Sequence, residues 1–130
     1  MSPHSLTRAN GARRYTLPGL VVLVCIFDIL VAHAQDDLSY YARRAYGAYY
    51  TGAYSEAEEY AERVLDAGLD DPNVTTALIR AELAQGKYTE AAETAVTAAE
   101  TFAEYFPVQV VAVEALLAGG KEREAKAVLD

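Results

Sequence analysis

The chain has 130 residues, a length typical of one domain, with 19 acidic and 11 basic side chains and a formal charge of −8. The first 34 residues hold three of the basic side chains and a single acid, Asp28, so residues 35–130 carry a formal charge of −10. A polyanionic domain repels nucleic acid and anionic membrane surfaces, so we expect neither as its partner. The only cysteine, Cys25, excludes an intramolecular disulfide.

Residues 1–34 have the layout of a secretory signal peptide. Three arginines precede an apolar run over residues 17–31, which Asp28 interrupts and which Ala32-His33-Ala34 follows. A basic start, an apolar middle and two small residues flanking one other residue are the features that direct export and cleavage. We therefore predict cleavage after Ala34 and a periplasmic or extracellular location for residues 35–130.

An uncleaved membrane anchor is the alternative for this segment. The apolar run has 15 residues and an internal charge, whereas a spanning helix needs about 20 apolar residues. If the segment stays in place, its arginines are expected to remain in the cytoplasm. Both interpretations place the rest of the chain outside the cytoplasm.

A six-residue pattern returns twice at a fixed distance in residues 35–130. Gly52-Ala53-Tyr54-Ser55-Glu56-Ala57 is followed by Gly86-Lys87-Tyr88-Thr89-Glu90-Ala91 and by Gly120-Lys121-Glu122-Arg123-Glu124-Ala125, with 34 residues between successive glycines. A constant period of this length indicates an array of helix pairs. We expect three repeats, at residues 38–71, 72–105 and 106–130, the last of them incomplete.

Each repeat is predicted to contain two helices with a glycine turn between them. Their expected spans are residues 38–51, 55–67, 72–85, 89–103, 108–118 and 122–130. Asp36 and Asp37 suit the start of the first helix, and Asp71 before Pro72 suits the start of the third. Ser55, followed by Glu58, and Thr89 are expected to cap the second and fourth. No segment alternates with period two for long, so no sheet is expected.

These features resemble the tetratricopeptide repeat family. Its pattern has a small residue at the eighth place, glycine at the fifteenth, an aromatic at the seventeenth and a small residue at the twentieth. The first repeat has Ala45, Gly52, Tyr54 and Ala57 at these places, and the second has Ile79, Gly86, Tyr88 and Ala91. The departures are Arg44, where leucine is usual, Glu82, which replaces an aromatic, and Glu122, which replaces the tyrosine of the third repeat.

The resemblance implies an all-α fold. It is a right-handed superhelical array of antiparallel helix pairs, an α-solenoid, whose last helix is truncated here. Because the third repeat is incomplete and three repeats are about the minimum for a stable array, we also expect marginal stability.

Residues 35–130 contain no His, Cys, Met or Trp. These absences remove the usual general base, the thiol nucleophile and the soft metal ligands, so we expect neither an enzyme, a cofactor nor a metal site. The acids Glu56, Glu58, Glu59 and Glu62 share one predicted helix, which is the ordinary appearance of a solvated face. This pattern therefore argues against an enzyme that acts through paired carboxylates.

In the family resembled, the first helix of each repeat lines a concave face that binds peptides. The corresponding residues here are Ser39, Ala42, Tyr46 and Tyr49, then Asn73, Thr76, Arg80 and Leu83, and then Pro107, Val110, Glu114 and Leu117. From these we select Tyr46, Tyr49, Asn73, Thr76, Arg80, Val110 and Glu114 as candidate partner-binding residues. The Lys and Asn with which co-chaperone members hold a terminal carboxylate are replaced by Ala42 and Tyr46, so that clamp is absent.

Two functions remain open from the sequence. The first is an exported, non-catalytic adaptor that binds a peptide or protein in this face, with Tyr46 and Tyr49 as interface aromatics and Arg80 as a partner for carboxylates or carbonyls. Against it stands the ordinary alternative that the tyrosines pack the first helix against its neighbour. The second function is a self-assembling structural element, because the shortened last helix leaves the apolar helix at residues 108–117 poorly covered.

Overall fold

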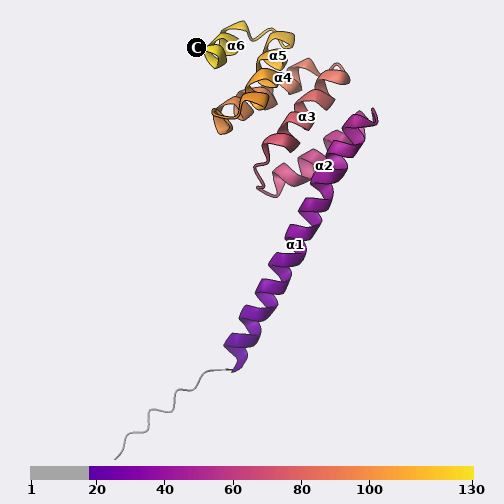
Figure 1. Cartoon of the computed structure of the whole chain (residues 1–130), viewed down its shortest axis with the longest axis vertical. Helices are drawn as coiled ribbons and strands as arrows, with labels where there is room; N and C mark the ends of the chain where they lie inside the picture. Colours follow the sequence, from indigo (N-terminus) through magenta and orange to yellow (C-terminus); the bar gives the residue numbers. More distant parts are fainter. Residues whose placement is uncertain (1–17) are drawn as a thin grey trace, which may run out of the picture. The chain divides into compact units, whose positions relative to one another are not determined.

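The structure, a computed structural model, describes residues 18–130. These residues form six helices and no strand, which confirms the all-α prediction for the described part of the chain (Figure 1). The helices are α1 (Pro18–Tyr50), α2 (Tyr54–Asp66), α3 (Pro72–Ala84), α4 (Tyr88–Thr101), α5 (Phe106–Ala118) and α6 (Glu122–Leu129). The three arginines and Leu17 of the predicted leading segment lie outside the described residues.

The chain divides by its internal contacts into two units, residues 1–33 and residues 34–130. In the first unit, the large apolar side chains between Leu20 and Val31 are all exposed to solvent. Within α1, Gly19–Tyr50 is long and apolar enough to cross a membrane. A signal sequence meets the same criterion, so both interpretations of the leading segment stay open.

The predicted start of the first helix at Asp36 and Asp37 is wrong. Helix α1 already begins at Pro18 and runs without interruption to Tyr50. Neither Pro nor Gly stands between Gly19 and Gly47, so nothing in the backbone stops the helix where the sequence turns from apolar to acidic.

Glycines end the helices as predicted. Gly52, Gly68, Gly86 and Gly120 have φ values between +74° and +80°, a conformation that costs glycine little and other residues more. In the turn after α3, the N–H of Lys87 donates to the Glu82 carbonyl and the N–H of Gly86 donates to that of Leu83. Together these two bonds close the helix end in the Schellman arrangement.

The predicted N-caps are correct at one helix and wrong at two. The Asp71 carboxylate accepts hydrogen bonds from the backbone N–H groups of Asn73 and Val74, and Pro72 opens α3. Helices α2 and α4 instead start at the tyrosine before the expected cap, and neither has a side-chain cap. Only one residue stands between the turn glycine and the start of the next helix, so Ser55 and Thr89 fall inside the first turn.

Residues 34–130 hold three clusters of buried apolar side chains. Ala45, Ala61, Val64, Val74 and Leu78 join α1, α2 and α3 in one cluster, and Ala48, Ala57 and Ala81 join the same helices in another. Alanines at these contacts let helix axes approach closely, as the repeat pattern requires. All three clusters lie in this unit, which therefore contains its own core.

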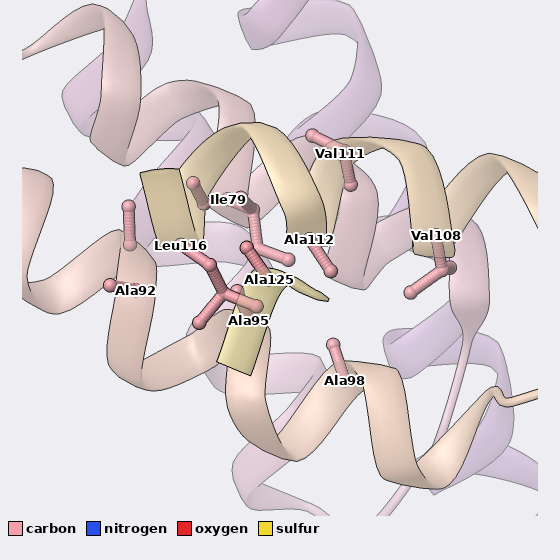
Figure 2. Close-up of a cluster of buried hydrophobic side chains, with 11 residues drawn as sticks. Ile79, Ala92, Ala95, Ala98, Val108, Val111, Ala112, Leu116 and Ala125 are labelled. Atoms are coloured by element: carbon pink, nitrogen blue, oxygen red, sulfur yellow. The ribbon is translucent and has the colours of Figure 1, made fainter. Parts of the chain in front are cut away.

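The largest cluster joins α3, α4, α5 and α6 (Figure 2). It consists of Ile79, Ala91, Ala92, Ala95, Ala98, Val108, Val111, Ala112, Ala115, Leu116 and Ala125. Each helix packs against the next from α2 onward, and α3 also packs against α5. The first helices of the second and third repeats are therefore neighbours, and the short α6 is held through Ala125.

Candidate functional site

Three of the predicted binding residues meet in one depression of the surface. Tyr49 of α1, Arg80 of α3 and Glu114 of α5 line it, although 31 and 34 residues separate them along the chain. Its volume is about 420 Å³, and its remaining lining residues are Tyr54, Leu83 and Ala84. We call this site the Arg80 depression. Helices α1, α3 and α5 each contribute at least one side chain to it.

The two charged groups of the Arg80 depression are exposed, and neither forms an ion pair or a side-chain hydrogen bond within residues 18–130. The Arg80 guanidinium presents donors only, and the Glu114 carboxylate presents acceptors only. A ligand that carries both an acceptor and a donor, such as a peptide backbone, can therefore engage both of them. The apolar lining beside them comes from Leu83 and Ala84.

Tyr49 serves both as a core residue and as a wall of the site. Its ring packs against the cluster of Ala48, Ala57 and Ala81. It also contacts the rings of Tyr50 and Tyr54, with centroid separations of 5.3 and 6.1 Å. Because the ring is fixed on one side by packing, its free face forms a rigid apolar surface at the edge of the depression.

Tyr46, Asn73 and Thr76 are absent from the lining of the Arg80 depression. The Tyr46 hydroxyl is buried without a hydrogen-bond partner, and this burial raises the pKa of Tyr46 well above its usual range. The Asn73 side-chain carbonyl accepts a hydrogen bond from the Tyr105 hydroxyl at 3.2 Å. The Thr76 hydroxyl donates to the Pro72 carbonyl of its own helix. These contacts give all three a local structural role.

Val110 lies in a different depression, at the C-terminal end of the unit. Its lining is Phe106, Gln109, Val110, Val113, Val128 and Leu129, and its volume is about 390 Å³. Val110 and Glu114 lie on the same helix and line different depressions. Of the seven predicted residues, three therefore line the Arg80 depression, one lines this second depression, and three line neither.

Sequence reasoning missed a layer of arginines and tyrosines on α1 and α2. The Arg44 guanidinium lies 5.3 Å from the centroid of the Tyr60 ring, and that of Arg63 lies 5.2 Å from the Tyr41 ring. The two tyrosine rings stack on each other with centroids 5.9 Å apart. Each cation thus covers the ring on the opposite helix, which explains why Arg44 is tolerated where the repeat pattern has leucine.

A second missed feature is the buried carboxyl group of Glu82. Glu82 is only 5% exposed. Its Oε1 atom accepts a hydrogen bond from the Thr94 hydroxyl at 3.2 Å, and its Oε2 atom has no hydrogen-bond partner. Burial raises the pKa of Glu82 to about 7, and the negative charges of Glu58 and Glu62 act in the same direction. The Thr94 hydrogen bond and Lys87 oppose this change only in part.

Beside Glu82, polar side chains connect the first repeat with the second. The Lys87 ammonium donates to both Glu58 oxygens at 2.6 and 2.7 Å. Gln85 donates to Glu58 at 2.7 Å and accepts from the Ser55 hydroxyl at 3.0 Å. Burial opposes ionisation of Glu58, but the bonds from Lys87 and Gln85 outweigh it and lower the pKa of this carboxyl group. Ser55 and Glu58, expected to form a capping box, are engaged here instead.

Within residues 18–130, no group of three His, Cys, Asp or Glu side chains is arranged to hold a metal ion. Comparisons of the chain with models of known families, with curated proteins and with solved structures find no match.

Proposed function

We propose that residues 35–130 form a tetratricopeptide-like array that binds an extended peptide segment of a partner protein, without catalysis, in the Arg80 depression. The observation that carries this proposal is the meeting of Tyr49, Arg80 and Glu114, one side chain from the first helix of each repeat, in a single depression. Repeat arrays commonly present their concave surface to partners in this way.

The packing of the helices supports a right-handed array of antiparallel pairs. Consecutive helices pack on each other from α2 onward, α3 also packs on α5, and three-residue linkers centred on Gly52, Gly86 and Gly120 join the helices of each pair. Linkers this short favour antiparallel neighbours. The buried alanines at the twentieth place, Ala57, Ala91 and Ala125, agree with the same arrangement.

The chemistry of the depression favours a peptide backbone as ligand. In our proposal the Arg80 guanidinium donates to a backbone carbonyl or an acidic side chain, and Glu114 accepts from a backbone N–H or a basic side chain. An apolar side chain of the ligand then packs on Tyr49 and Leu83. A volume of about 420 Å³ suits one or two residues of an extended chain.

A synthetic peptide array tests this function directly. We expect residues 34–130 to bind a defined subset of peptides, and Arg80→Glu to weaken binding to that subset by about tenfold or more, since a repelling charge replaces the donor. Arg63→Glu is the matched control, because Arg63 lies at the aromatic layer outside the depression. Equal losses from both substitutions would reject the Arg80 depression as the binding site.

Export is the remaining part of the proposal. The exposed apolar side chains of Leu20–Val31 and the Ala32-His33-Ala34 sequence support a leading segment that carries the repeats out of the cytoplasm. Mass determination of the protein from its own host would show a chain beginning at Gln35 if the segment is removed, and a full-length, membrane-associated chain if it serves as an anchor.

A further inference from the structure

The 34-residue period allows each surface of α5 to be compared with the same surface of α1 and α3. One set of places in the period holds Leu38, Ala42, Ala45 and Tyr49 in the first repeat, and Pro72, Thr76, Ile79 and Leu83 in the second. None of these eight residues is exposed, because the following repeat covers them. We call this surface the trailing face of a repeat.

The trailing face of the third repeat is uncovered. Its residues are Phe106, Val110, Val113 and Leu117, and three of them are exposed: Phe106 by 75%, Val110 by 48% and Leu117 by 55%. Leu129 at the end of α6 is exposed by 72% beside the same depression. Three exposed apolar residues of α5 and the partly buried Val113, with no charge among them, thus form an apolar stripe along this helix.

The opposite surface of each repeat, its leading face, changes its chemistry along the array. In the second and third repeats it consists of Val74, Ala77, Leu78 and Ala81, and of Val108, Val111, Ala112 and Ala115, all of them buried. In the first repeat the same places hold Tyr40, Arg43, Arg44 and Gly47, all of them exposed. The first repeat therefore ends the array with a charged face.

This asymmetry excludes one mode of assembly and favours another. A chain that added head to tail would place its charged leading face, with Arg43 and Arg44, on the apolar stripe of the next chain, and would bury both guanidinium groups against a surface that carries no acidic side chain. The spacing of the stripe, at intervals of four, three and four residues, is instead that of a helix seam that packs against a like seam. A two-fold axis brings two such seams together.

We propose that the trailing face of α5 binds the same face of a second copy of the chain, so that the protein is a symmetric dimer through Phe106, Val110, Val113 and Leu117. The only charged residue of α5 is Glu114, so the pairing places no like charges within the seam itself. Both copies carry a large negative charge elsewhere, and added salt is therefore expected to strengthen the dimer by screening their repulsion.

Site-specific disulfide formation in the full-length chain tests this interface. In a Cys25→Ser background, Val110→Cys places a thiol beside the two-fold axis, and Thr97→Cys places one on the exposed part of α4 as the control. After mild oxidation in detergent micelles, we expect about tenfold more covalent dimer from Val110→Cys than from Thr97→Cys. Equal yields would overturn the proposal, since the leading segment is the same in both chains.

Two further experiments distinguish the symmetric dimer from head-to-tail assembly and from binding of a different protein to the stripe. A mixture of Val110→Cys chains with Gly47→Cys chains would form more mixed than self disulfide if assembly were head to tail, and that result would overturn the symmetric dimer. A disulfide between Val110→Cys and a different protein in the host would do so as well. The non-covalent readout is Val110→Asp, which should give a monomer in sedimentation with unchanged helicity, because Val110 is exposed in the single chain. A dimer that persists would contradict the proposal.

Discussion

The first repeat contacts the second, and the second contacts the third, through the same places of the 34-residue period. The residues at and beside these places are polar in the first contact and apolar or small in the second. Glu82 and Thr94, both in the second repeat, form a hydrogen bond beside the first of these contacts. The residues 34 places later are Leu116, which is fully buried, and Val128, which packs against the same cluster. A buried carboxyl–hydroxyl pair within the second repeat thus corresponds to an aliphatic pair within the third.

The turns beside these pairs also differ, with polar side chains at one turn and small side chains at the other. In the first contact Glu58 binds Gln85 and Lys87. The residues equivalent to Glu58 and Gln85 are Ala92 and Gly119, and a Cβ atom placed on Gly119 would lie only 2.5 Å from that of Ala92. The second contact is therefore closed by small side chains where the first is joined by polar ones.

The comparison teaches that one backbone pattern accommodates two kinds of repeat contact. The contact around Leu116 depends on apolar burial, which responds little to pH. The contact around Glu82 contains ionisable groups whose charge depends on pH near neutrality. Mutations at equivalent places should consequently differ in size, and in their dependence on pH.

The largest effect is expected at Leu116. Leu116→Ala removes the largest side chain that α5 contributes to the cluster of Figure 2 and leaves a cavity, which should lower the free energy of unfolding by about 2–5 kcal/mol. Chemical denaturation of residues 34–130 measures the change. Glu93→Ala, at an exposed position of α4, should change it by less than about 0.5 kcal/mol. Equal losses from the two variants would show that this contact is not closed as described.

Glu82→Gln should stabilise the protein in a pH-dependent way. Because the pKa of Glu82 is raised to about 7 in the folded state, the unfolded chain loses its proton first as pH rises. The folded state therefore becomes less stable between about pH 4.5 and 7, and the full penalty remains above pH 7. The glutamine removes this penalty, so we expect a gain of about 1–3 kcal/mol at pH 8 and little change at pH 4.5.

Denaturation curves at pH 4.5, 6 and 8 for both chains provide the measurement. Glu93→Gln is the control, since Glu93 is exposed on α4, and it should leave the pH profile unchanged. A gain from Glu82→Gln that is the same at all three pH values would mean that Glu82 is not buried in its protonated form.

Gly119→Ala and Gly120→Ala sharpen the comparison at the turn. The methyl group added at Gly119 would contact Ala92 and, at 2.8 Å, the backbone oxygen of Tyr88, so we expect a loss of about 1–3 kcal/mol. At Gly120 there is open space but φ is +74°, and the loss should be about 1 kcal/mol. Gln85→Ala, at the place equivalent to Gly119, introduces no such contact. A loss at Gly120 that exceeds the loss at Gly119 would argue against the close approach of α4.

The smallest of these losses is expected from Glu58→Gln. The lowered pKa of Glu58 means that its ion pair stabilises the folded state above about pH 4.5 and that this contribution disappears as pH falls further. The expected pH dependence therefore has the opposite sign to that of Glu82. Stability measured at pH 7 and at pH 3.5 should show a larger loss at pH 7 than at pH 3.5. A loss that is equal at both values would assign the role of Glu58 to packing.

Much of the helical pattern was predictable because it depends on local backbone chemistry. The helix bounds from α2 onward follow from the glycine turns, and the cap at Asp71 follows from its position before Pro72. The start of α1 was missed because acidic residues permit a helix start without requiring one. The roles of Ser55 and Glu58 were missed because their partners lie about 30 residues away, in the next repeat.

The candidate site was predicted in part for the same reason. The repeat pattern selects residues at fixed places of each first helix, and three of them, Tyr49, Arg80 and Glu114, line the Arg80 depression. It could not indicate that the Tyr46 hydroxyl would be buried or that the Asn73 side chain would bind Tyr105, because both depend on residues distant in the sequence. The burial of Glu82 likewise depends on α4, to which no local signal pointed.

Photo-crosslinking from position 49 tests the central claim most directly. The full-length chain, produced in its own host with a benzophenone amino acid in place of Tyr49, should form a covalent adduct with a partner protein upon irradiation. The same group in place of Tyr88, exposed on α4, should not, and Arg80→Glu should abolish the adduct from position 49. Adducts of equal yield from both positions, or an adduct that survives Arg80→Glu, would contradict peptide binding in the Arg80 depression.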